Sequence, residues 1–178
     1  RRGVFHSRLC GQLGRRSESR KTILRLWRRH RSHPAVIHHF GWHLLELRGP
    51  AHTRAFHLSH PPPADASAAR RADTLLQEAE VLTTLRDFTR ARSRIEEAES
   101  LAPGLRWLAV TRGRLLAAMD LQSELLAHAR EAAARHPSCW HRPMIEAEAL
   151  VALGRDDEAL DGLRRHACRF EAPFLMAQ

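Results

Sequence analysis

Residues 72–104 read ADTLLQEAEVLTTLRDFTRARSRIEEAESLAPG, and this stretch decides the fold. Apolar residues recur at helical spacing in both of its halves, first at Leu75, Leu76, Ala79, Leu82 and Leu85 and then at Phe88, Ala91, Ile95 and Ala98. This spacing puts the apolar side chains on one face of an α-helix. Arg86-Asp87 separates the two halves as a turn, and Pro103-Gly104 ends the second. The stretch therefore predicts a hairpin of two helices, of which the first begins at Asp73 as its N-cap.

The same unit recurs along the chain with a period of 34 residues. This spacing separates the small residues Ala79, Gly113 and Ala147, the leucines Leu82, Leu116 and Leu150, and the prolines Pro103 and Pro137. A fixed period of this size is typical of a solenoid built from copies of one supersecondary unit. Each hairpin has apolar residues on two faces, so it buries both only by stacking on neighbouring hairpins. The resulting extended concave surface is one that usually binds other macromolecules.

Upstream of residue 72 the period persists more weakly. Ser7 and Gly41 are 34 residues apart, but Gly41 and Ala79 are 38 apart, and Pro61-Pro62-Pro63 lies between them. Three consecutive prolines cannot continue a helix. The predicted organisation is therefore a basic, His-rich pair of degenerate repeats at residues 1–58, an interrupting loop at 59–70, and three repeats at 71–178 that end in the start of a further helix.

The pattern resembles the tetratricopeptide repeat, whose 34-residue unit is two antiparallel helices with small residues where they touch and a proline near the end. One copy carries the whole signature at Leu75, Ala79, Leu82, Phe88, Ala91, Ile95, Ala98 and Pro103. The next copies match at Gly113, Leu116, Ala132 and Pro137, and at Ala147, Leu150, Gly154, Ala159 and Leu163. The resemblance implies an all-α fold, a right-handed αα solenoid of about five such helical hairpins.

The resemblance also implies a binding surface, because in this family the residue after each small position faces the concave groove. The groove residues expected here are Arg8, Trp42, Glu80, Arg114 and Glu148, together with His38. Mixed charges with one aromatic anchor suit an extended peptide or an exposed partner helix. The set lacks the paired lysines and asparagines that clamp a carboxylate in chaperone-binding members. The sequence therefore predicts a noncatalytic scaffold for a protein or peptide partner, with Arg8, Trp42 and Arg114 as its main contacts.

Positive charge is concentrated in the N-terminal third of the chain. The net charge is +9, yet most of the acidic residues lie after residue 60. On a helix, a positive stripe forms opposite the inward-facing Ile23, Leu24 and Trp27, and it consists of Arg20, Lys21, Arg25, Arg28 and Arg29. Such a stripe could be a solvated face, or it could bind an acidic protein or the phosphates of a nucleic acid.

Signatures of catalysis are missing from the sequence. It contains no phosphate-binding glycine loop and no H-E-x-x-H or G-x-S-x-G motif, so we expect neither enzymatic activity nor a cofactor. His39 and His43 have a spacing that can chelate a transition metal, but no Cys or acid lies at a matching spacing, so we assign no metal site and leave the question open. Cys10 occupies a position where other copies have leucine, which predicts a packing role.

Three cysteines that are far apart in sequence favour a reducing compartment and hence a cytoplasmic location. No apolar stretch is long enough to span a bilayer.

Two alternatives to the scaffold function remain at this point, and the oligomeric state is also open. The chain could be a regulatory or substrate-recruiting segment of a larger enzyme, because it lacks an initiator Met and has the apolar Phe174-Leu175-Met176 near its end. It could instead bind nucleic acid through the arginine stripe.

Overall fold

The computed structural model describes residues 2–135 and 141–175. This part of the chain is all α-helical and contains no strand. Its helices are α1 (Arg2–Gln12), α2 (Arg16–Arg29), α3 (Pro34–Ser59), α4 (Ala68–Thr84), α5 (Phe88–Leu101), α6 (Arg106–Ala118), α7 (Gln122–Arg135), α8 (His141–Ala152) and α9 (Asp156–Leu175).

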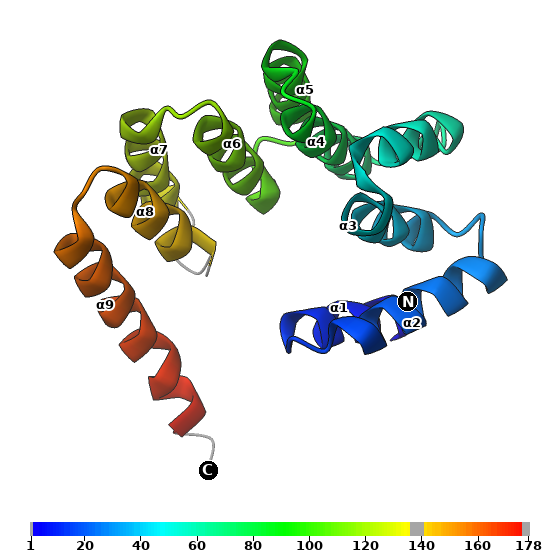
Figure 1. Ribbon diagram of the computed structural model, residues 1–178. Coiled ribbons are helices and arrows are strands. Elements are labelled where there is room, and N and C mark those ends of the chain that lie inside the picture. Colours follow the sequence, from blue (N-terminus) through cyan, green and yellow to red (C-terminus); the bar gives the residue numbers. More distant parts are fainter. Residues whose placement is uncertain (1, 136–140, 176–178) are drawn as a thin grey trace.

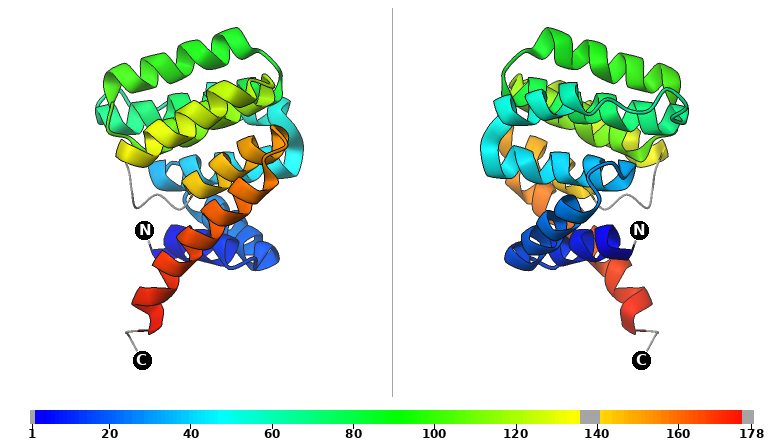
Figure 2. Two further views of the ribbon diagram at one scale, coloured as in Figure 1. Left: turned by 90° about the vertical axis from the view of Figure 1, so that its left-hand side faces the viewer. Right: turned by 90° about the vertical axis from the view of Figure 1, so that its right-hand side faces the viewer.

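The helices form successive hairpins that follow one another along an arc (Figure 1). Four hairpins are α1–α2, α4–α5, α6–α7 and α8–α9, and α3 supplies a fifth because it breaks at Gly49. Figure 2 shows that α1 and the end of α9 lie on the same side of the molecule. Both ends of the arc therefore point to its open side. The described residues thus form the all-α solenoid of hairpins that the 34-residue period predicts.

The turn of the second hairpin was not predicted. Inside α3, Gly49 has φ 79° and ψ 179°, a conformation that is essentially restricted to glycine. Pro50 follows at the start of the second half, where its missing N–H costs no helical hydrogen bond. Two helical segments are therefore joined by a single residue, where the sequence showed only a weak repeat.

The turns of the hairpin at residues 72–104 follow the predicted residues. Asp87 caps α5, since its carboxylate accepts a hydrogen bond from the N–H of Arg90 at 3.3 Å. Arg86 takes the left-handed conformation, with φ 59°, and lets the chain reverse. Helix α5 then ends at Leu101, just before the predicted stop at Pro103-Gly104.

The start of the same hairpin is corrected by the structure. Helix α4 begins at Ala68 and not at Asp73, because the Ser67 hydroxyl accepts a hydrogen bond from the N–H of Arg70 at 3.3 Å and caps the helix there. Helix α3 also continues through Ser59. The interruption is consequently residues 60–67, which is shorter than the predicted loop at 59–70.

The core consists of separate apolar clusters along the arc. The central cluster joins α4, α5 and α6 and is built from Ala72, Leu76, Ala79, Leu82, Ala91, Ile95, Ala98, Leu108 and Leu115. A second cluster joins α7, α8 and α9 around Leu125 and Leu150. A third joins α2 to α3, with Trp27 stacked on Phe40 at 4.6 Å between ring centroids. Separate clusters of this kind are what stacked repeats produce.

The small residues at the repeat period are all buried: Ser7, Gly41, Ala79, Gly113 and Ala147. Gly113 shows why this matters. A Cβ atom at Gly113 would lie 3.3 Å from Cγ2 of Ile145 on α8 and 3.6 Å from Cδ1 of Leu125 on α7. Helix α6 therefore approaches two neighbouring helices at a point where there is room for hydrogen but little room for a side chain.

We expect Gly113→Leu to lower the free energy of unfolding by about 1–3 kcal/mol, because the added side chain overpacks this crossing. Urea unfolding followed by circular dichroism measures the loss. Gly162→Leu on α9 is the matched control, since no heavy atom lies within 4 Å of a Cβ built there. Equal losses in the two variants would contradict the close crossing at Gly113.

Candidate binding groove

The inner side of the arc is formed by the first half of α3 and by α4, α6 and α8 (Figure 1). Besides His38, which is described below, these helices carry four of the predicted groove residues. Trp42 is half-buried, Glu80 is buried, and Arg114 and Glu148 are exposed. The side chain of the fifth, Arg8, lies outside the described residues. The structure therefore distributes the four along successive hairpins rather than gathering them at one point.

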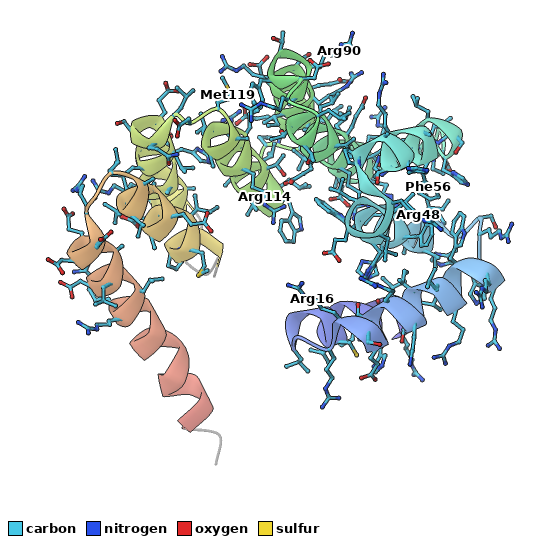
Figure 3. All side chains as sticks on the ribbon, viewed as in Figure 1. Arg16, Arg48, Phe56, Arg90, Arg114 and Met119 are labelled. Atoms are coloured by element: carbon cyan, nitrogen blue, oxygen red, sulfur yellow. The ribbon has the colours of Figure 1, made fainter. Side chains whose placement is uncertain are left out.

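Glu80 and Arg114 form an ion pair between adjacent hairpins. Oε1 of Glu80 lies 2.9 Å from Nη1 of Arg114 and accepts a hydrogen bond from the Thr111 hydroxyl at 3.1 Å. Burial raises the pKa of Glu80, while the Arg114 guanidinium and the Thr111 hydroxyl oppose that rise. The pair fixes the direction of the arginine, whose side chain remains 49% exposed on the inner side of the arc (Figure 3).

His38, the sixth predicted groove residue, links α3 to α4. Its Nε2 atom lies 3.0 Å from Oδ2 of Asp73, and its backbone oxygen accepts a hydrogen bond from Nε2 of Gln77 at 3.0 Å. Nε2 of Gln77 also lies 2.8 Å from Nδ1 of the ring, so two polar side chains of the next hairpin hold the ring. A partner in the groove would have to compete with these contacts to bind His38.

His38 also lines a cavity of about 480 Å³ between α3, the proline segment and α4, which sequence reasoning missed. Other residues around the cavity include Arg31, Phe56, His57, His60 and Arg70. The Nδ1 atom of His57 is buried and has no hydrogen-bond partner within the described part of the chain. Burial, and to a lesser extent His38 and His60, lower the pKa of His57 to about 4. The sequence signal for this cavity was the triple proline at residues 61–63, which directly follows His60 and comes shortly after His57.

The basic stripe is exposed along its whole length. Arg20, Lys21, Arg25, Arg28 and Arg29 are all solvent-accessible on α2. The opposite face of α2 buries Ile23 completely against Val36 and Phe40 of α3. The stripe is therefore a cationic surface of the first hairpin, on a helix that packs on α1 and α3 and not on α4, α6 or α8.

His39 and His43 do lie together, as their spacing predicts, with ring centroids 5.1 Å apart. Their neighbours are hydroxyl groups: Nε2 of His39 lies 3.3 Å from Oγ of Ser7, and Nε2 of His43 lies 3.3 Å from Oγ of Ser19. Burial lowers the pKa of His43, which favours the neutral form of its ring. The two histidines thus connect α3 to α1 and α2 through a buried polar cluster.

Within the described ranges, no helix combines the length and the apolar character needed to cross a bilayer. No family model matches the chain, and no curated protein matches it. One solved structure, described as MamA AMB-1 P212121, is similar to it with a TM-score of 0.44 and 14% sequence identity, covering 92% of this chain and 85% of that one.

Proposed function

We propose that the chain is a tetratricopeptide-like, noncatalytic scaffold that binds an acidic peptide segment along the inner side of the arc. The observation that carries this proposal is the half-exposed Arg114, which the buried Glu80 holds in place. A guanidinium group has five N–H donors, so Arg114 can pair with Glu80 through Nη1 and still bind a carboxylate of a partner. Such a preorganised arginine loses little conformational freedom when it binds.

The charge of the chain favours an acidic occupant. The net charge is +9, and the exposed cations of α2 add a positive field at the N-terminal end of the arc. A field of this sign speeds the approach of an acidic peptide and disfavours basic ones. Trp42, on the first half of α3, supplies an aromatic surface for an apolar side chain of the same peptide.

Trp42→Ala and Arg114→Gln are each expected to weaken the binding of short acidic peptides by about 2 kcal/mol, the loss typical of a central interface residue. Fluorescence anisotropy with labelled peptides that contain glutamate and leucine measures the change. Arg90→Gln is the matched control, because Arg90 lies on the outer side of α5 and pairs with Asp87 at the surface (Figure 3).

Binding that survives both groove variants would contradict the proposed surface.

The exposed stripe favours a second candidate function, the binding of nucleic-acid phosphates, and the affinity of such binding falls steeply as the salt concentration rises. Replacing the five cations of the stripe by glutamine would abolish nucleic-acid binding, whereas peptide binding through Trp42 and Arg114 would persist with slower association. If the chain serves a larger enzyme, the same groove would recruit that enzyme's substrates. A cytoplasmic location stays a prediction.

A further inference from the structure

Three side chains that can ligate metal meet at the first hairpin. His6 and Cys10 lie one helical turn apart on α1, and Glu18 lies in the first turn of α2. The Nε2 atom of His6 is 3.3 Å from Oε1 of Glu18 and 3.5 Å from Sγ of Cys10. All three ligand atoms lie within 4.8 Å of one another. The cluster therefore combines an imidazole nitrogen, a sulfur and a carboxylate oxygen around one point.

The separation of His6 from Glu18 and that of His6 from Cys10 match those around a tetrahedral zinc ion, and the sulfur and the carboxylate oxygen lie within 4.8 Å of each other. Zinc binds histidine nitrogen and carboxylate oxygen at about 2.0–2.1 Å and cysteine sulfur at about 2.3 Å, which at tetrahedral angles separates N from O by about 3.3 Å and N from S by about 3.6 Å. The side chains of the hairpin already hold nearly these distances. Little rearrangement is needed for them to become three ligands of one ion.

The local structure holds the ligands in place. The Ser19 hydroxyl donates to the backbone oxygen of Ser7 at 2.7 Å, and the Ser7 hydroxyl donates to the backbone oxygen of Ser19 at 2.9 Å. These buried bonds fix the register of α1 against α2 next to His6 and Glu18. Nη1 of Arg15 lies 3.8 Å from Oε2 of Glu18, and the other oxygen, Oε1, lies beside His6. The donor set is thus preorganised by the hairpin itself.

The site is also reachable from solvent. Cys10 is only 3% exposed, while the side chains of His6 and Glu18 are 53% and 47% exposed. A buried thiol beside two exposed ligands lets an ion approach from one side and leaves room there for water. Zinc sites with three protein ligands and one position open to water are known in proteins, chiefly in enzymes.

We propose that His6, Cys10 and Glu18 bind one zinc ion, with a water molecule as the fourth ligand. On binding, the S–H bond of Cys10 breaks, its proton goes to water, and a sulfur–zinc bond forms without any change of oxidation state. The mixed nitrogen, oxygen and sulfur set suits zinc better than the oxygen-preferring magnesium or calcium. The ion clamps α1 to α2 at the first hairpin of the array. This site differs from the His39–His43 pair, whose ring nitrogens lie beside serine hydroxyls.

Cobalt(II) is the probe for the test, because it replaces zinc and gives a sulfur-to-metal absorption band in the near ultraviolet only when a thiolate binds it. The purified chain is titrated with cobalt, then with zinc, which should displace the band at one ion per chain. Zinc should also raise the melting temperature in a concentration-dependent way. Cys10→Ser should abolish the band. His6→Gln removes a direct ligand and should therefore weaken zinc binding more than the loss of an outer-shell partner does, which is about 10–100-fold.

Two controls make the outcome decisive. Replacing Cys139 and Cys168 together by serine should leave the band intact, and His52→Gln, at an exposed histidine of α3, should leave the zinc affinity unchanged. His6→Gln tests the site independently of any folding defect in the Cys10 variant, since the His6 side chain is half exposed. The proposal is overturned if no thiolate band appears, if the band depends on Cys139 or Cys168, or if the His6 variant binds zinc as tightly as the unchanged chain.

Discussion

Leu76→Ala is expected to lower the free energy of unfolding by about 2–5 kcal/mol, the cost of removing a large side chain from a well-packed core. Leu76 is 1% exposed and lies in the central cluster, in which α4, α5 and α6 meet. The loss combines the apolar surface that is no longer buried with the cavity left behind. Urea unfolding measures it, and Leu160→Ala on α9 is the matched control because Leu160 is 46% exposed.

The distribution of the lost stability along the chain is as informative as its total amount. In stacked repeats each hairpin contacts only its neighbours, so a defect in the central cluster weakens nearby helices most. Hydrogen exchange of Leu76→Ala should therefore show lost protection in α4, α5 and α6 and nearly unchanged protection in α8. Uniform loss along the whole chain, or a stability change below about 1 kcal/mol, would contradict a core divided into clusters.

Acidification from pH 7 to pH 4 is expected to remove about 3 kcal/mol of stability through His57 alone. The pKa of His57 is about 4 in the folded chain, below its ordinary value of 6.5, because burial disfavours the charged ring. The unfolded chain therefore takes up the proton first as the pH falls. The contribution is complete above pH 6.5, declines between pH 6.5 and about 4, and is lost below that. His43, whose pKa burial also lowers, acts in the same direction.

Urea unfolding at a series of pH values tests this prediction. His57→Gln cannot titrate, so its stability should fall less steeply than that of the unchanged chain between pH 6.5 and 4. His52→Gln, at an exposed position of the same helix, should keep the original slope. Identical slopes for all three proteins would show that the ring of His57 is not buried as described.

Most of the hairpin structure could be predicted because helical spacing and turn residues act locally. Asp87 caps α5, and the small residues at the 34-residue period are all buried, as the pattern requires. The start of α4 was missed because residues 68–71 carry no apolar periodicity and the cap is the side chain of Ser67. The Gly49-Pro50 turn was missed because a single residue replaces the usual turn between helices, although a Gly-Pro pair is itself a signal of a break.

The candidate site was predictable only in part. Glu80 and Arg114 occupy the same register in successive repeats, so both were expected on the inner helices, but their pairing depends on the distance between α4 and α6. The cluster of His6, Cys10 and Glu18 depends on how α1 is aligned against α2, which no periodicity reveals. His38 was expected in the groove, and its contacts with Asp73 and Gln77 follow from the way α4 packs on α3.

The φ angle of Gly49 sets the angle between the two halves of α3, and through it the orientation of the first hairpin relative to the rest of the arc. No heavy atom lies within 4 Å of a Cβ built at Gly49, so the demand for glycine there is purely conformational. Any other residue would relax toward a negative φ and rotate the preceding half of α3. Helices α1 and α2 pack on α3, so they would move with it relative to the rest of the arc. The distance between the two ends of the arc therefore depends in part on this one backbone torsion.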